Sequence, residues 1–406
     1  MRKEINTSGW RLPVLFLSVL ILAVTVQACG GSSKDAEEPK QEKKEGDAKQ
    51  ALEQAMEAEK AGQLDAAEEH YDRARKLRPQ HLETAERYTR FLLAQKRPAD
   101  AVRVAKEFLE GSMSELQAYY LLAEAQVANR DYPGAYETLS QLLELEANEA
   151  AAYARRGEIA IKQEKFEQGL ADIRKAVELS PQNPDHRVAL GKALQDAGDL
   201  DGAAKELATV LKDHPEHVGV HLVYGAVLRT QGKRDEAFEL HKKAVELAGD
   251  DPMAHYELAI SHFYLGKNKD AQESLERAMA LAPDDAQIRY VYGEVLRNLK
   301  SYEEAAQRYR EALERDPAHD KATTKLGLVL TFLEKDDEAV TVLKARVAEH
   351  REDAEAHYLL GTIYEKQEKF TEAVEAYDAF LEVAAESDPN VAEARRKVRL
   401  LKRKLK

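Results

Sequence analysis

The feature that most constrains this chain is a period of 34 residues, which runs without insertion or deletion from residue 48 to residue 387 and gives ten units. Positions are counted here from the first residue of each unit. Position 20 is Ala67, Ala101, Ala135, Gly169, Ala203, Ala237, Ala271, Ala305, Ala339 and Ala373, and position 8 is Ala55, Thr89, Ala123, Gly157, Gly191, Gly225, Ala259, Gly293, Gly327 and Gly361. Two small columns in fixed register predict a pair of closely crossing helices in every unit, because a larger residue would push their axes apart. Such units bury their apolar faces on one another.

Two further columns agree with a helical hairpin. Position 32 is proline in five units, and proline ends a helix because it lacks the N–H group and clashes with the preceding turn: Pro79, Pro181, Pro215, Pro283 and Pro317. Position 24 is mostly large: Tyr71, Leu139, Ile173, Leu207, Leu275, Tyr309, Leu343 and Tyr377. These columns resemble the tetratricopeptide (TPR) repeat family. The resemblance implies an all-α, right-handed superhelical TPR solenoid of about ten helix-turn-helix repeats over residues 48–387.

The last residues predict a cap for this solenoid. Apolar residues recur at intervals of three and four, which places them on one face of a helix: Val391, Ala394, Val398, Leu401 and Leu405. A solenoid needs a polar-faced element to cover its terminal unit. We therefore expect residues 388–406 to form a basic capping helix.

The N-terminal region has the layout of a signal peptide, with three basic residues in the first eleven followed by a largely apolar run over residues 12–26. This run is shorter than the roughly twenty residues that a membrane-spanning helix needs. It ends at Val-Gln-Ala-Cys, residues 26–29, which resembles the lipobox of bacterial lipoproteins. The resemblance implies removal of residues 1–28 and lipidation of Cys29, the single cysteine of the chain. A generic secretory signal with an incidental cysteine is the alternative.

The residues after the cysteine predict which membrane holds the protein and how the repeats are joined to the anchor. Gly30, in place of the aspartate that favours inner-membrane retention, resembles the outer-membrane type of lipoprotein and implies a periplasm-facing protein. Residues 30–47 contain no aromatic or β-branched residue and too few apolar ones to bury a core. We therefore expect residues 29–47 to form a lipidated, disordered tether.

Catalytic and metal-binding patterns are weak. None of the twelve histidines precedes a glutamate, which removes the His-Glu-x-x-His motif, and no glycine-rich phosphate loop or nucleophile triad is recognisable. His221, His255 and His357 share position 4, but residues in equivalent positions of stacked repeats lie on the order of 10 Å apart, too far to share one metal ion. We expect a non-enzymatic protein without cofactor or metal.

Charge limits the partners. The formal net charge is −14, which disfavours nucleic acid as a partner. The last twelve residues oppose this trend, since eight of them are basic and none is acidic. They either form a solvated cap face, favourable to the helix dipole, or contact an anionic surface of the envelope.

A partner-binding groove is predicted from the TPR resemblance, which implies that positions 2, 5, 9, 12 and 13 of each first helix line the concave face. In repeat 7 all five positions are apolar or aromatic, whereas repeat 5 carries a mixed set. Large exposed apolar patches often mark partner sites, and aromatic and arginine residues are common anchors. The predicted groove residues are Leu222, Arg229, Met253, Tyr256, Ile260, Phe263, Tyr264, Tyr290, Arg297, Leu328 and Phe332. Packing within the scaffold is the alternative reading of this patch.

These features together favour a non-catalytic, lipid-anchored scaffold of the bacterial envelope that binds a protein or peptide segment in its groove and assists assembly or localisation of a complex. The alternative function is an accessory factor for an exported polysaccharide, in which groove aromatics would stack on sugar rings.

Overall fold

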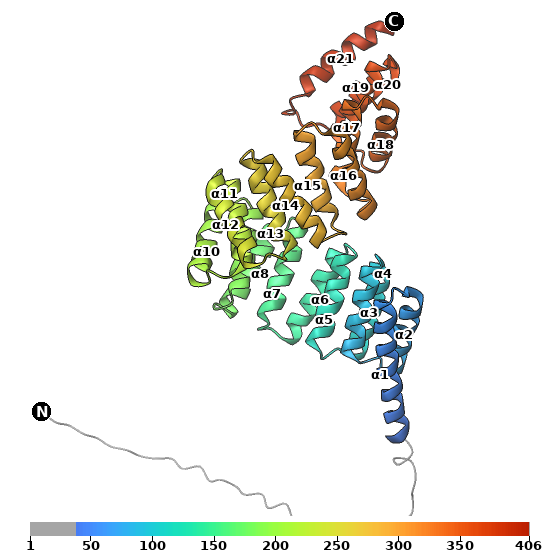
Figure 1. Ribbon diagram of the computed structural model, residues 1–406, viewed down its shortest axis with the longest axis vertical. Helices are drawn as coiled ribbons and strands as arrows, with labels where there is room; N and C mark the ends of the chain where they lie inside the picture. Colours follow the sequence, from blue (N-terminus) through green and yellow to red (C-terminus); the bar gives the residue numbers. More distant parts are fainter. Residues whose placement is uncertain (1–37, 406) are drawn as a thin grey trace, which may run out of the picture. The chain divides into compact units, whose positions relative to one another are not determined.

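The computed structural model describes residues 38–405, and all regular secondary structure in that range is helical (Figure 1). This confirms the all-α repeat fold. The chain divides into two compact units, one ending at Ser112 and the other beginning at Met113. The first unit contains α1 (Glu38–Lys60), α2 (Leu64–Leu77), α3 (Leu82–Ala94) and α4 (Pro98–Gly111).

The second unit contains the remaining repeats. Its helices are α5 (Leu116–Ala128), α6 (Tyr132–Leu145), α7 (Ala150–Lys162), α8 (Phe166–Leu179), α9 (Pro184–Asp196), α10 (Leu200–Asp213), α11 (Val218–Thr230), α12 (Arg234–Leu247), α13 (Pro252–Tyr264), α14 (Asn268–Leu281), α15 (Ala286–Asn298), α16 (Tyr302–Arg315), α17 (Asp320–Phe332), α18 (Asp336–Glu349), α19 (Ala354–Lys366), α20 (Phe370–Val383) and α21 (Val391–Lys404). The typical repeat has a first helix of 13 residues and a second of 14, as in α7 and α8.

The first helix corrects one expectation. α1 begins at Glu38, inside the segment 29–47 that was expected to be a disordered tether. The reason is that its added residues are rich in Glu, Lys and Gln, which are strong helix formers, and that Pro39 stands where proline is tolerated. Extending a helix already nucleated in repeat 1 needs little further stabilisation. The rest of the tether, Cys29 and the signal peptide lie outside the described residues.

The two small columns meet where the helices of a repeat cross. In repeat 4 both positions are glycine, and a Cβ atom added to Gly157 would lie 2.7 Å from the carbonyl oxygen of Gly169. A Cβ atom added to Gly169 would lie 2.7 Å from the carbonyl oxygen of Gly157. The backbones of α7 and α8 therefore touch directly, which explains why repeat 4 departs from the alanine that the other nine units have at position 20.

Position 8 is also matched in size to position 24 of the same repeat. A Cβ atom on Gly191 would come within 2.5 Å of Leu207, and one on Gly293 within 2.6 Å of Tyr309. Repeat 2 reverses the sizes, since the larger Thr89 pairs with the smaller Ala105 and both are fully buried. In repeat 2 the larger residue at position 8 is thus accompanied by a smaller one at position 24, as a closely packed contact requires.

The turn between the two helices of each repeat has a left-handed residue at position 15. Glycine fills it in four repeats and other residues, such as Glu164 with φ of 60°, fill it in six. The left-handed conformation costs a non-glycine residue roughly 1 to 2 kcal/mol. The geometry of the turn is therefore imposed by the stacked helices, even where the local residue disfavours it.

The C-terminal helix covers the last repeat. Val391, Ala394, Val398 and Leu401 of α21 are buried in a core cluster that extends back through α13. Leu405, expected on the same stripe, is 48% exposed because it follows the end of the helix. No helix within residues 38–405 combines the length and the apolarity that crossing a bilayer would need.

Candidate partner-binding surface

The predicted groove residues of repeats 6 to 9 divide by exposure. Met253, Tyr264 and Phe332 are 44%, 47% and 50% exposed. Leu222, Arg229, Ile260, Tyr256, Phe263, Arg297 and Leu328 are half-buried. Tyr290 is only 9% exposed, which corrects the expectation that it faces the groove. Three of the eleven predicted residues are therefore exposed, and seven others present only part of their side chains to solvent.

Tyr290 is buried because the following repeat covers it. Its ring centroid lies 5.9 Å from that of Tyr309 and 4.8 Å from that of His319, which precedes α17. Burial raises the pKa of the Tyr290 phenol to about 12. Tyr290 therefore contributes to packing between repeats.

The aromatic residues of α13 have different surroundings. Tyr256 and Phe263 pack against the core cluster, and Tyr256 accepts a hydrogen bond of 3.3 Å from the Gln287 amide. Desolvation raises the pKa of Tyr256. Tyr264 is more exposed, and the Arg234 guanidinium lies over its ring, 5.5 Å from the centroid of the Tyr264 ring. Met253 and Tyr264 stand at opposite ends of the helix, about 16 Å apart along its axis.

The two predicted arginines are already ion-paired within the chain. An Arg229 guanidinium nitrogen lies 2.5 Å from a Glu257 carboxylate oxygen, and one of Arg297 lies 2.9 Å from a Glu294 oxygen. Both side chains are partly buried. They are held in place by these carboxylates, so a partner would have to displace them to bind a guanidinium.

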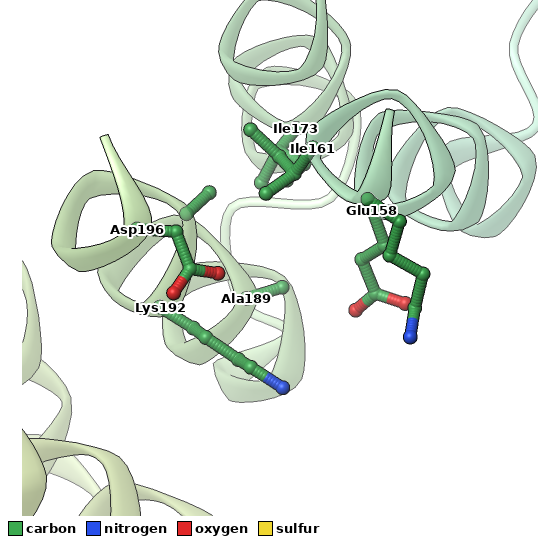
Figure 2. A pocket seen from close by; sticks show the side chains of 8 residues that line it. Glu158, Ile161, Ile173, Ala189, Lys192 and Asp196 are labelled. Carbon is green, nitrogen blue, oxygen red and sulfur yellow. The ribbon is translucent and has the colours of Figure 1, made fainter. Parts of the chain in front are cut away.

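A second surface, in repeats 3 to 5, was not among the predicted residues. A hollow of about 210 Å³ lies between α7 and α9, with an apolar wall and a charged rim formed by Glu158, Ile161, Lys162, Ile173, Ala189, Lys192, Ala193 and Asp196. Figure 2 shows Glu158 and Asp196 on opposite sides of this hollow, with Ile161 and Ile173 above and between them in the view. A neighbouring hollow of about 350 Å³ shares Glu158 and Lys162. We call the two together the charged hollow.

The charged hollow combines both signs of charge. Desolvation by its walls raises the pKa values of Glu158 and Asp196, although Lys192 acts in the opposite direction on each. Among the described residues, neither carboxylate is joined to a basic side chain in an ion pair. The hollow therefore offers an apolar floor and unpaired charges, which suits side chains of a bound polypeptide segment.

The sequence analysis noted only that repeat 5 carries a mixed set at the predicted groove positions, and it did not single out these charges. The available signal was the recurrence of charged residues at positions 9 and 13 of neighbouring repeats, where Glu158 and Lys192 share position 9 and Lys162 and Asp196 share position 13. Their placement around one hollow depends on how α7 and α9 stack.

Comparison with known proteins identifies the repeat. Models of the tetratricopeptide repeat match residues 52–115, 120–184, 188–252, 256–320, 296–363 and 354–387. The chain belongs to the tetratricopeptide repeat family. TPR proteins are generally non-enzymatic scaffolds for protein–protein interaction. Within residues 38–405, no group of three or more histidine, cysteine or acidic side chains is placed to hold a metal ion.

Three individual proteins illustrate the similarity. Human Superkiller complex protein 3 is 27% identical over 187 residues, which cover 43% of this chain and 12% of that protein. A thermophilic TPR protein of Thermus thermophilus is 21% identical, with a TM-score of 0.42, and covers 45% of this chain and 99% of its own. A human IFIT1 dimer with PPP-AAAA is 17% identical, with a TM-score of 0.49, covering 82% of this chain and 89% of its own.

Proposed function

We propose that this TPR protein is a lipid-anchored scaffold of the bacterial cell envelope, held at the outer membrane facing the periplasm, which binds a protein or peptide segment in its concave groove and assists assembly or localisation of a complex. The observations that carry the binding role are the half-exposed aromatic side chains of Tyr264 and Phe332, each at the C-terminal end of a first helix, and the charged hollow between α7 and α9. The lipobox-like segment before Cys29 supports the anchor.

The anchor is tested by Cys29→Ser. We expect this variant to lose acylation and membrane partition, because a hydroxyl cannot replace the thiol as the acyl acceptor of a lipobox. Stable anchoring of a protein to a membrane needs more than one acyl chain. A variant without acyl chains should therefore stay in the soluble fraction. Metabolic acyl labelling and membrane fractionation measure the result. Persistent label together with membrane partition in the variant would refute lipidation at Cys29.

The groove is tested by the double substitution Tyr264→Ser and Phe332→Ser. Both side chains are about half exposed, so we expect the melting temperature to change little. Partner capture in envelope extracts should fall by about thirtyfold, because the loss of an interface anchor typically costs about 2 kcal/mol or more. The measurement is the amount of each crosslinked partner protein that the variant captures, relative to the amount that the parent protein captures.

The matched control for this experiment is Met113→Ser with Leu145→Ser, which removes two exposed apolar side chains, 64% and 58% exposed, outside the predicted groove. Equal capture by both double variants would contradict the groove proposal. Capture that appears only when a purified envelope polysaccharide is added would instead support the polysaccharide function.

A further inference from the structure

The C-terminal helix α21 has a second face that its role as a cap does not use. At 100° per residue, Arg396, Arg399, Leu400 and Arg403 project opposite to the buried stripe of Val391, Ala394, Val398 and Leu401. We call these four residues the outward face. Leu400 is 47% exposed at its centre.

Most other cations of this helix are engaged inside the protein. The contacts are Arg395 with Glu386 at 2.6 Å, Lys397 with Glu365 at 2.9 Å, Lys402 with Asp378 at 2.9 Å, and Lys404 over the Phe370 ring at 4.7 Å. These contacts fix α21 on the last repeat. The basic composition of the segment is therefore partly explained by packing.

The outward face is different. Arg396 approaches Glu393 only at 3.9 Å, and Arg399 and Arg403 have no ion pair, hydrogen bond or ring contact within residues 38–405. All three cations are arginines, whose planar guanidinium groups bind phosphate oxygens in pairs. The apolar Leu400 lies between these arginines. Its side chain would gain nothing from binding a soluble polyanion, but it can insert at the boundary between lipid headgroups and acyl chains.

We propose that the outward face of α21 binds the surface of a bilayer that contains anionic phospholipid, with Arg396, Arg399 and Arg403 on lipid phosphates and Leu400 inserted among them. The inference rests on the proposed lipid anchor, which would keep such a bilayer close. Each cation near an anionic membrane strengthens binding about fivefold, so the patch alone is weak. Anchoring at Cys29 converts this contact into an intramolecular one, which raises its effective concentration.

The test uses the full acylated chain in vesicles of phosphatidylcholine, with or without about one-third phosphatidylglycerol. Ala392→Cys places a thiol on the same side of α21 as the arginines, at an exposed residue, and an environment-sensitive dye is attached there. Because Cys29 is the only native cysteine, acylation leaves the new thiol as the single labelling site. We expect a docked dye population only on the anionic vesicles.

Two variants with equal loss of charge separate the outward face from general electrostatics. Arg399→Gln with Arg403→Gln should lower the ratio of docked to undocked dye about thirtyfold. Arg395→Gln with Lys402→Gln, which removes two cations already paired inside the protein, should change it little. Equal effects of the two pairs, or no docked population for the parent chain, would overturn the proposal. A melting curve for each variant shows that the cap remains folded.

Leu400→Gln distinguishes a bilayer from an acidic polymer. We expect this change to reduce docking on anionic vesicles severalfold while leaving the binding of soluble inorganic polyphosphate unchanged. The proposal would be overturned if Leu400→Gln docked on anionic vesicles as well as the parent does and polyphosphate competed completely with the vesicles. The ligand of the outward face would then be a soluble polyanion and not a bilayer. If Cys29 also takes up dye, the anchor proposal has failed separately, and co-sedimentation with the same vesicles still tests the outward face.

Discussion

Replacing Asp172 by alanine is expected to lower the free energy of unfolding by about 3 to 5 kcal/mol, because it leaves the Arg156 cation unpaired at a largely buried site. Two guanidinium nitrogens of Arg156 lie 2.8 Å from the two Asp172 carboxylate oxygens, and the side chains are 17% and 11% exposed. The bond to Asp172 raises the pKa of Arg156. Arg156 also donates to the Ser140 hydroxyl at 3.2 Å, so the pair joins α6, α7 and α8.

The matched control replaces both partners by residues that other repeats use. Position 7 is leucine in Leu122 and Leu190, and position 23 is valine in Val104 and Val342. Arg156→Leu with Asp172→Val should therefore restore stability to within about 1 kcal/mol of the parent protein, since exchanging a whole buried pair for apolar residues is often neutral. Urea unfolding, with hydrogen exchange in α6 to α8, measures both variants. A double variant as unstable as Asp172→Ala would show that the pair itself stabilises the repeat.

The second large effect is a loss of stability in mild acid. His241 is completely buried at position 24 of repeat 6, with Nδ1 at 2.7 Å from the Ser261 hydroxyl and Nε2 at 3.2 Å from the Leu222 carbonyl. A carbonyl only accepts, so Nε2 carries the proton of the neutral ring. Gly225 makes room for it, since a Cβ atom there would lie 2.2 Å from Nε2.

Desolvation lowers the pKa of His241 to about 4 from its ordinary 6.5, although Glu257, 3.9 Å away, opposes this shift. The folded state therefore binds this proton more weakly than the unfolded state does. The contribution of the neutral His241 to the free energy of unfolding is fully present above pH 6.5. It is lost as the pH falls toward 4, by about 3 kcal/mol in total.

The measurement is the free energy of unfolding of the parent and of His241→Leu between about pH 7.5 and 4, at intervals of about half a unit. Leucine is the residue at this position in repeats 5 and 7, as Leu207 and Leu275, and Leu207 packs against a glycine as His241 does. The free energy of unfolding of the parent should fall relative to that of the variant as the pH is lowered, because only the parent must deprotonate His241 when it folds in acid. Parallel pH profiles would contradict the assignment of the effect to His241.

Sequence periodicity was sufficient to predict the helical repeat, because each column reports a contact that recurs in every unit. The small side chains at positions 8 and 20, such as Gly157 and Gly169, are visible without coordinates. The left-handed turn residue was also detectable, because Gly62, Gly198, Gly232 and Gly266 all occupy position 15. The helical start of α1 was not, since its polar residues have helix propensity without a hydrophobic pattern.

The binding surface was less predictable because exposure depends on the neighbouring repeat. A helical wheel places Tyr290 and Tyr256 on the same face, yet His319 of the repeat junction covers the former. The same reasoning applies to the charged hollow, where Glu158 and Asp196 become opposite walls only after α7 and α9 stack. Patterns within one unit predict its own hairpin, whereas interfaces between units require the geometry of the stack.

The size matching between positions 8 and 24 bears on how a gene for such a chain can recombine. A crossover between repeats that exchanges whole 34-residue units keeps each hairpin contact intact, since both partners move together. A crossover within the turn between helices would join Thr89 to a bulky partner such as Leu207, or Gly191 to Ala105, and would create a clash or a void. Duplication and loss of repeats should therefore leave breakpoints between hairpins and spare the turns inside them.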